Sequence, residues 1–240
     1  MTQGTTQAGK RVLVAGATGG VGQLTVAQLL NQAYTVRAMT RSLDKARQLF
    51  GRQVEVAIAD IRDPETLPAA VQAVDAIICC TGTTAFPSER WQFDIAAADP
   101  IESALSWTRV YFDADYRQQR SQNNPAAVDA VGVANLVKAA PSTLQRFVFV
   151  SSCGVERRQQ FPFSLLNAFG VLDAKAEGEA AIRQSGLPYT IVRPARLTDG
   201  PYTSYDLNTL IQATTDRKRG ITLSTGDRLN GQSDWFDHLG

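Results

Sequence analysis

The chain has 240 residues and a formal net charge of +1, and 44% of its residues are hydrophobic. A chain of this length buries about 70–75% of the surface that it exposes when unfolded, so it folds without a disulfide or metal, and its near-neutral charge argues against a nucleic-acid binder. Three cysteines and one histidine show no metal-ligand spacing, and no apolar run approaches the ~20 residues of a membrane span, so we expect a cytoplasmic protein without a metal site or an integral membrane segment.

The first element after a polar, disordered segment 1–10 is predicted to be a strand over residues 12–15, with a helix over residues 21–31. Between them glycine recurs with the spacing G-x-x-G-x-x-G. A strand, a glycine turn and a helix N-terminus form an anion-binding device, because the backbone can approach a phosphate closely and unpaired N–H groups point at it. We therefore predict dinucleotide binding here, against the alternative of an ordinary tight turn. The predicted contact residues are Gly16, Thr18, Gly19, Gly20, Val21 and Gly22.

A second strand is predicted over residues 35–39, and Arg41 and Ser42 follow it. NAD-binding proteins usually carry an acidic residue near this point for the ribose hydroxyls, whereas the 2′-phosphate of NADP needs a cation. No acidic residue lies between Arg11 and Asp44, and a guanidinium can donate two hydrogen bonds to one phosphate. The predicted cofactor is therefore NADP(H). The alternative is that Arg41 is only a solvated surface cation.

Strands and helices keep alternating along the chain. This order predicts an α/β fold with a doubly wound parallel sheet, the Rossmann fold, as a single domain over residues 11–240 with a small C-terminal substrate lobe at about 195–240. Ligands of such sheets bind outside the carboxyl ends of the strands, where the small residues Thr81 and Gly82 could lie against a ligand. Further helices are expected at 42–50, 63–73, 124–140, 165–184 and 207–213, and further strands at 54–58, 76–80, 146–150, 189–192 and 221–223.

The pattern is interrupted between residues 85 and 124, where polar and aromatic residues mix without periodicity. A stretch of this length inside a compact domain is usually functional. We expect an insertion near the ligand cleft with one or two short helices. Its aromatic residues make it a candidate surface for a protein partner.

Six motifs resemble those of atypical short-chain dehydrogenases/reductases, and more narrowly those of the NAD(P)H-binding, NmrA-like group of cyanobacteria and plastids. The resemblance implies that the glycine turn holds the pyrophosphate and Arg41 the 2′-phosphate. It also implies that Asp60 and Ile61 border the adenine, while Lys175 and the turn at Pro194 and Ala195 approach the nicotinamide ribose. The motifs are GATGGVG at 16–22, MTRS at 39–42, ADIRDP at 59–64, VSS at 150–152, DAKAE at 173–177 and VRPARL at 192–197.

The family's usual catalytic residues are a serine, a tyrosine and a lysine. The tyrosine stands one helical turn before the lysine, so that the ammonium lowers the pKa of the phenol and the phenol can pass a proton to a carbonyl. The resemblance implies Ser151 or Ser152, and Lys175, as catalytic residues. The position four residues before Lys175, however, is Val171, which has no proton to donate.

Three interpretations follow. The chain could be an NADPH-dependent oxidoreductase whose proton donor is water, one of the two serines, Lys175, Tyr202 or Tyr205. Its unknown small-molecule substrate would then be one that accepts hydride without strong acid, such as a quinone, a flavin or a conjugated carbonyl compound. It could instead be a non-catalytic NADP(H)-binding redox sensor or assembly factor. A weaker third interpretation makes Cys153 a nucleophile, although no histidine is near it in sequence.

Overall fold

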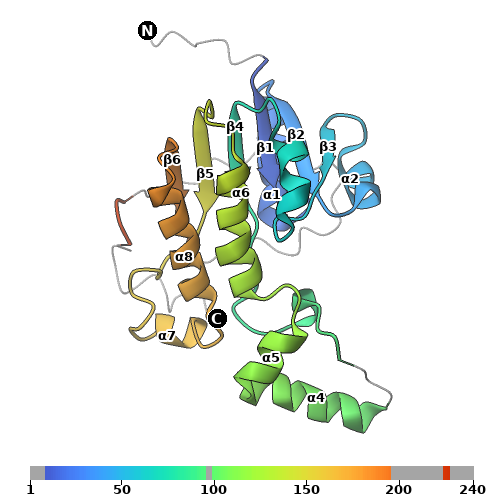
Figure 1. The fold of residues 1–240 in the computed structure, drawn as a ribbon, viewed down its shortest axis with the longest axis vertical. Helices are drawn as coiled ribbons and strands as arrows, with labels where there is room; N and C mark the ends of the chain where they lie inside the picture. Colours follow the sequence, from blue (N-terminus) through green and yellow to red (C-terminus); the bar gives the residue numbers. More distant parts are fainter. Residues whose placement is uncertain (1–8, 96–98, 196–223, 228–240) are drawn as a thin grey trace.

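The computed structural model describes residues 9–95, 99–195 and 224–227. In these ranges six strands form one parallel sheet in the order β3-β2-β1-β4-β5-β6 (Figure 1). The order reverses between β1 and β4, which is where doubly wound sheets bind their ligands. The predicted Rossmann fold is confirmed. The strands are β1 (Arg11–Ala15), β2 (Thr35–Thr40), β3 (Glu55–Ile58), β4 (Ala76–Cys79), β5 (Arg146–Val150) and β6 (Tyr189–Val192).

Helices cover both faces of the sheet, so both faces are buried. Because successive side chains of a strand point to opposite faces, each strand contributes to two cores. Leu13 of β1 belongs to the larger core under α3, α6 and α8, and its neighbour Val14 to the second core under α1 and α2. Figure 1 shows α6 and α8 side by side on one face. The α-helices are α1 (Gly20–Asn31), α2 (Leu43–Phe50), α3 (Leu67–Val71), α4 (Pro100–Phe112), α5 (Ala114–Arg120), α6 (Val133–Ala139), α7 (Phe163–Leu166) and α8 (Val171–Gln184).

Several helix starts follow directly from local sequence. The Ser42 hydroxyl accepts a hydrogen bond from Lys45 N (3.2 Å) and begins α2. Asp63 accepts one from Glu65 N (3.1 Å) and begins a 3-10 turn over Pro64–Thr66 that leads into α3. Such side chains satisfy N–H groups that the first helical turn leaves unpaired, which is why these boundaries were predictable.

The helix expected over 165–184 is wrong as a single element. The structure has α7 and α8 instead, with Gly170 between them at φ +80°. Asn167 Oδ1 accepts hydrogen bonds from Leu172 N (2.9 Å) and Asp173 N (3.1 Å) and so starts a new helix. Both helices supply residues to one apolar cluster, including Phe163 and Leu172, and this shared burial imitates one continuous periodic pattern.

The helix expected over 124–140 is present but begins as a π-helix, Ala126–Gly132 (η3), which continues into α6. The helix at 207–213, the strand at 221–223 and most of the lobe at 195–240 lie outside the described residues, as does most of segment 1–10. In the described part of the chain, no helix is long and apolar enough to cross a membrane.

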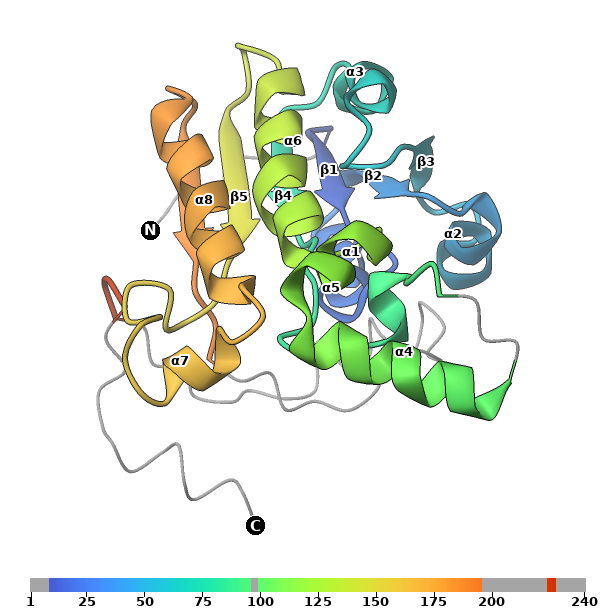
Figure 2. The same ribbon diagram turned by 60° about the horizontal axis from the view of Figure 1, so that its bottom comes forward.

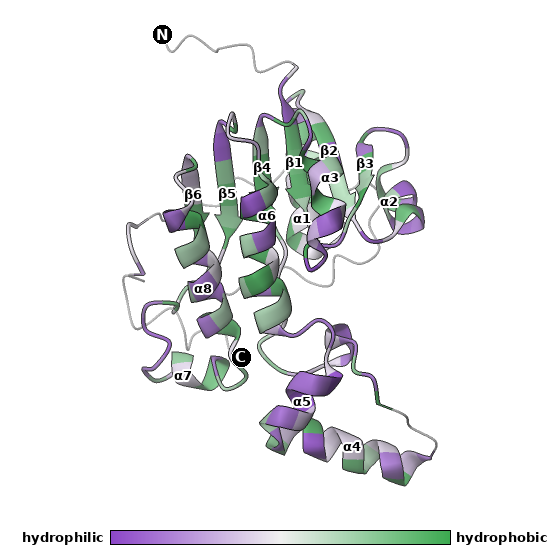
Figure 3. Ribbon diagram, in the orientation of Figure 1, coloured by the Kyte–Doolittle hydropathy of each residue, from purple (hydrophilic) through white to green (hydrophobic). Residues whose placement is uncertain are grey.

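The insertion at 85–124 contains two helices, as expected, although the 13-residue α4 is longer than predicted. Figures 1 and 2 show α4 and α5 beyond the carboxyl ends of the strands. The part of the insertion that precedes α4 is held in place by Trp91, which is 2% exposed and donates from Nε1 to Thr84 Oγ1 (3.0 Å). Apolar and polar residues alternate along α4 (Figure 3), and Ile101, Leu105 and Phe112 are exposed.

Candidate nucleotide-binding site

The turn between β1 and α1 accepts only glycine at two positions. Gly16 has φ +74°, and a Cβ there would lie 3.0 Å from Thr81 N. A Cβ on Gly22 would lie 2.1 Å from Gly16 O, well inside van der Waals contact. Gly19 N donates to Gly16 O (3.0 Å) and closes the turn. Helix and strand therefore approach each other at a distance that a side chain would prevent.

The N-terminus of α1 is open. Gly19 and Gly20 are exposed, the helix has no side-chain cap, and its first turn contains no acidic residue. The turn is held in place by Gln23, a buried side chain that donates to Thr18 O (3.0 Å). Uncapped N–H groups at the positive end of the helix dipole suit an anion. The residues present therefore fit the pyrophosphate of a dinucleotide.

Arg41 and Asp60 stand at the carboxyl ends of β2 and β3. Arg41 is exposed and donates from Nη1 to Asn123 Oδ1 (3.0 Å). Asp60 receives hydrogen bonds from Arg62 Nε at 3.0 and 3.1 Å. Partial burial alone would raise the pKa of Asp60, but the Arg62 guanidinium outweighs it and holds this pKa below its usual value. The carboxylate is thus neutralised beside the arginine predicted to meet the 2′-phosphate. Ile61 is buried.

Thr81 and Gly82, which follow β4, connect the glycine turn to Lys175. Thr81 N lies against Gly16, and a Cβ on Gly82 would be 3.2 Å from Lys175 Nζ. The ammonium donates to Thr81 O and Val150 O, each at 3.1 Å, and so joins the ends of β4 and β5. The structure therefore brings these predicted site residues together along the switch point of the sheet.

Lys175 is not a solvated helix cation: it is 5% exposed. Its Nζ lies 2.7 Å from Asp129 Oδ1, an ion pair without the geometry of a directed hydrogen bond. Asp129 is fully buried in η3, and its Oδ2 accepts from Thr83 N (3.0 Å) and Thr83 Oγ1 (2.6 Å). The ammonium also lies over the ring of Phe149, 4.8 Å from its centre, so its contacts are made inside the protein.

Ser151 also faces inward. Its Oγ donates to Glu179 Oε1 (2.7 Å), and Arg193 donates to the same carboxylate from Nε (2.8 Å) and Nη2 (2.6 Å). Burial would raise the pKa of Glu179, but the hydrogen bonds from Arg193 and Ser151 lower it overall and keep the carboxyl ionised. The Ser152 hydroxyl donates to Cys153 O (3.1 Å). Within residues 9–95, 99–195 and 224–227, neither serine hydroxyl is hydrogen-bonded to a phenol.

Val171, which occupies the usual tyrosine position, is 7% exposed and lies in an apolar cluster. Pro194 and Ala195 continue from β6, and Pro194 O accepts from Cys153 N (3.0 Å), which places this turn beside the end of β5. Tyr202 and Tyr205, the alternative donors, lie outside the described residues. The position that would carry the acid in a typical ketone reductase is therefore both apolar and enclosed.

The three thiols should not react in the folded protein. Burial is the main cause that raises the pKa of Cys80, to about 12, and it also raises the pKa values of Cys79 and Cys153, so that all three stay protonated at neutral pH. We expect a thiol reagent at pH 7.5 to label the native chain slowly and all three cysteines after denaturation. A thiol in the native chain that reacts as fast as free cysteine would contradict this prediction. If that thiol were Cys153, the result would support Cys153 as a nucleophile.

Sequence reasoning missed four charged residues of this region: Asp129, Glu179, Arg193 and Asp227. Asp129 could have been noticed as a single acid among the apolar residues of 126–137, because such a residue is seldom buried without a partner. Glu179 and Arg193 carry no comparable local signal. Asp227, 6% exposed, accepts hydrogen bonds from Gly154 N (2.7 Å) and Glu156 N (3.0 Å) and joins the short segment 224–227 to the loop after β5.

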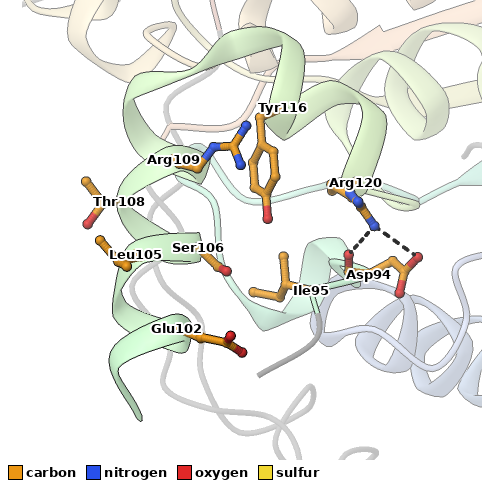
Figure 4. A pocket seen from close by; sticks show the side chains of 9 residues that line it. All are labelled: Asp94, Ile95, Glu102, Leu105, Ser106, Thr108, Arg109, Tyr116 and Arg120. Carbon is orange, nitrogen blue, oxygen red and sulfur yellow. Dashed lines mark hydrogen bonds and ion pairs between the residues drawn. The ribbon is translucent and has the colours of Figure 1, made fainter. Parts of the chain in front are cut away.

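A hollow of about 570 Å³ lies within the insertion and not at the glycine turn. Figure 4 shows Arg109 and Arg120 beside the ring of Tyr116, with Arg120 reaching Asp94. The guanidinium carbon of Arg109 is 4.1 Å from the ring centre, a cation–π contact. None of the predicted nucleotide-site residues lines this hollow.

Comparison with known proteins agrees with this geometry. A family model described as NAD(P)H-binding matches residues 16–224. Sanguinarine reductase of Eschscholzia californica is 30% identical over 198 residues, which are 78% of this chain and 69% of that protein. Photosystem II assembly factor Ycf39 of Trieres chinensis is 28% identical over 200 residues, 83% of this chain and 50% of that protein. The fold also resembles a putative NAD-dependent epimerase/dehydratase from Bacillus halodurans, with a TM-score of 0.56 and 23% identity over 81% of this chain and 74% of that one.

The chain spans only 30–39% of the length of the chloroplastic TIC 62 proteins of Arabidopsis thaliana, Pisum sativum and Oryza sativa, at 31–33% identity. The matched part nevertheless runs from the glycine turn past β6. It begins directly after β1 and includes α1 and β4, which lie next to the switch point. This chain belongs to the NAD(P)H-binding family of atypical short-chain dehydrogenases/reductases.

Proposed function

We propose that the chain binds NADP(H) and acts as an NADPH-dependent oxidoreductase on a quinone, a flavin or a conjugated carbonyl compound. The observation that carries the nucleotide part is the glycine turn, in which Gly22 meets Gly16 O beside an uncapped helix N-terminus. The backbone of this turn would hold the pyrophosphate and Arg41, with Ser42 beside it, the 2′-phosphate. Asp60 and Ile61 would border the adenine. The ribose end would lie along Thr81, Gly82, Lys175 and the turn at Pro194 and Ala195.

The choice of acceptor follows from the missing acid. A bound nicotinamide supplies hydride chemistry, and a typical carbonyl substrate also needs a proton from a nearby group. Val171 has no proton, the Ser151 hydroxyl is directed to Glu179, and Lys175 is paired with Asp129. Acceptors that stabilise the added electrons within a ring need less help from an acid. The similarity to sanguinarine reductase supports a reductase.

A second function is favoured by the observation that the Lys175 ammonium already has partners inside the protein. If the ammonium stays with Asp129, Thr81 O and Val150 O, the chain could hold a nucleotide without turning it over. It would then act as a redox sensor or assembly factor with the α4–α5 insertion as the partner surface. The similarity to an assembly factor supports this alternative. A cytoplasmic location stays a prediction, and some of the matched relatives are chloroplastic.

Titration of the full chain with NADPH and NADH, followed by fluorescence, tests the proposal. We expect NADPH to bind more tightly than NADH. Arg41→Ala should weaken NADPH binding by about 10- to 100-fold, because a charge-assisted contact to phosphate contributes roughly 1.5–3 kcal/mol, and should leave NADH binding unchanged. Arg47→Ala is the matched control, since Arg47 is also an exposed arginine but lies on α2.

The same samples, mixed with quinones, flavins and conjugated carbonyls, separate the two functions. Steady loss of NADPH absorbance with one acceptor class supports the reductase. Tight binding with no turnover on any of them supports the sensor or assembly factor. If Arg41→Ala and Arg47→Ala change NADPH affinity equally, Arg41 does not bind the 2′-phosphate. If the wild-type chain binds neither nucleotide, both proposed functions are overturned.

A further inference from the structure

Asn123, the second-last residue of the insertion, contacts the arginine at the end of β2. Its Oδ1 accepts a hydrogen bond from Arg41 Nη1 (3.0 Å), across 82 positions of sequence. Asn123 is 7% exposed, whereas Arg41 is exposed. A buried amide thus meets the exposed guanidinium predicted to bind the 2′-phosphate.

The amide of Asn123 is held from the opposite side. Its backbone N donates to Trp91 O (2.8 Å), and its side-chain Nδ2 donates to Arg90 O (3.2 Å). Trp91 is itself buried and tied to Thr84 in the loop after β4. Because Nδ2 is held by Arg90 O and the backbone by Trp91 O, Oδ1 is directed toward Arg41.

The neighbouring residue, Gln122, holds the second arginine of this edge. Its carbonyl oxygen accepts from Arg62 Nη1 (2.8 Å), and Arg62 in turn pairs with Asp60. Residues 122 and 123 therefore hold Arg41 in place and keep the Asp60 charge neutralised beside it. Without that neutralisation the carboxylate would oppose a phosphate at this edge.

We propose that Asn123 is a positioning residue that sets the preference for NADP(H) over NAD(H) by orienting the Arg41 guanidinium, an inference that rests on the proposed nucleotide binding. The hydrogen bond to Asn123 uses one Nη1 hydrogen and leaves the other donors of the fork for a phosphate. A guanidinium already held in place loses less rotational freedom when a ligand binds. NAD(H) has no 2′-phosphate, so its binding does not depend on this orientation.

Fluorescence titrations of the full chain with NADPH and NADH test this role. Asn123→Ala should weaken NADPH binding by roughly 3- to 10-fold, because the Arg41 side chain would then have to be immobilised when the nucleotide binds. Binding of NADH should stay unchanged. Asn123→Asp should weaken NADPH binding further, because its carboxylate would compete with the phosphate for Arg41. Each variant is first checked by its melting temperature.

Asn124→Ala is the matched control. Asn124 is half-buried and, like Asn123, hydrogen-bonded, in its case to Ser121 and Ala127 N, but it does not contact Arg41. It should lower stability without changing the NADPH-to-NADH preference. In an Arg41→Ala background, Asn123→Ala should cause no further loss of NADPH affinity, because it acts through that arginine.

Each other outcome overturns the inference. Equal losses for both nucleotides, or additive losses in the double variant, would make Asn123 merely structural. A wild-type chain that prefers NADPH, with the same preference in Asn123→Ala, would overturn the inference and leave the proposed function standing. A wild-type chain that binds neither nucleotide would overturn the two together.

Discussion

Replacing Gly22 with alanine should severely weaken nucleotide binding. The new Cβ would lie 2.1 Å from Gly16 O and 2.8 Å from Ala17 Cα, where a carbon and an oxygen normally keep about 3.3 Å. The obstructing atoms are backbone, so no side chain can move aside. The turn must open by more than about 1 Å, which displaces the N–H groups that would face the pyrophosphate. We expect NADPH affinity to fall by at least about 100-fold, equivalent to roughly 2.7 kcal/mol.

Gly51→Ala provides the control for a general effect of alanine on stability. Gly51 ends α2 at φ +57°, but a Cβ there meets nothing within 4 Å. Alanine in this sparsely populated backbone conformation costs about 1–3 kcal/mol of folding free energy through strain alone, yet NADPH affinity should stay unchanged. Binding is measured by fluorescence titration below the melting temperature of each variant. If Gly22→Ala binds NADPH as the wild type does, the glycine turn is not the phosphate site.

Removing the charge of Lys175 should give the largest loss of stability. Lys175→Met leaves Asp129, which has no exposed surface, with only its two hydrogen bonds from Thr83. Breaking a buried ion pair in this way costs about 3–5 kcal/mol, because one charge remains buried without its partner. For a chain of this size, each kcal/mol lowers the melting temperature by about 2–4 °C. Urea unfolding should therefore show a loss of about 3–5 kcal/mol in the free energy of unfolding. Thermal melting should show a fall of about 6–20 °C in the melting temperature.

The double variant Lys175→Met with Asp129→Leu separates folding from binding. It removes both charges and should regain most of the lost stability, since a buried pair is often replaceable by apolar residues of similar volume. If the double variant folds but binds NADPH weakly, Lys175 also contacts the nucleotide. If it binds normally, Lys175 serves only the fold. A Lys175→Met variant as stable as the wild type would contradict the buried pair.

Much of the local structure around the glycine turn could be predicted from the sequence. The glycine turn was predictable because Gly16 has a positive φ and Gly22 packs against Gly16 O, two requirements that lie within a few residues of each other. The helix starts at Ser42 and Asp63 were predictable because a cap acts on N–H groups two or three residues away. The strands were recognisable from short apolar runs bounded by turn residues. Each of these signals is local, so the order of residues contains it.

The tertiary structure alone decided how the charged side chains pair. Lys175 meets Asp129, Ser151 meets Glu179, and the arginine at the end of β2 meets an asparagine 82 positions later. None of these pairs has a characteristic spacing, because each depends on how separate elements pack on the sheet. The break between α7 and α8 was hidden for the same reason: both helices bury residues in one cluster. The sequence thus determined the sheet, its order of elements and the glycine turn, while packing decided which polar groups pair with one another inside the protein.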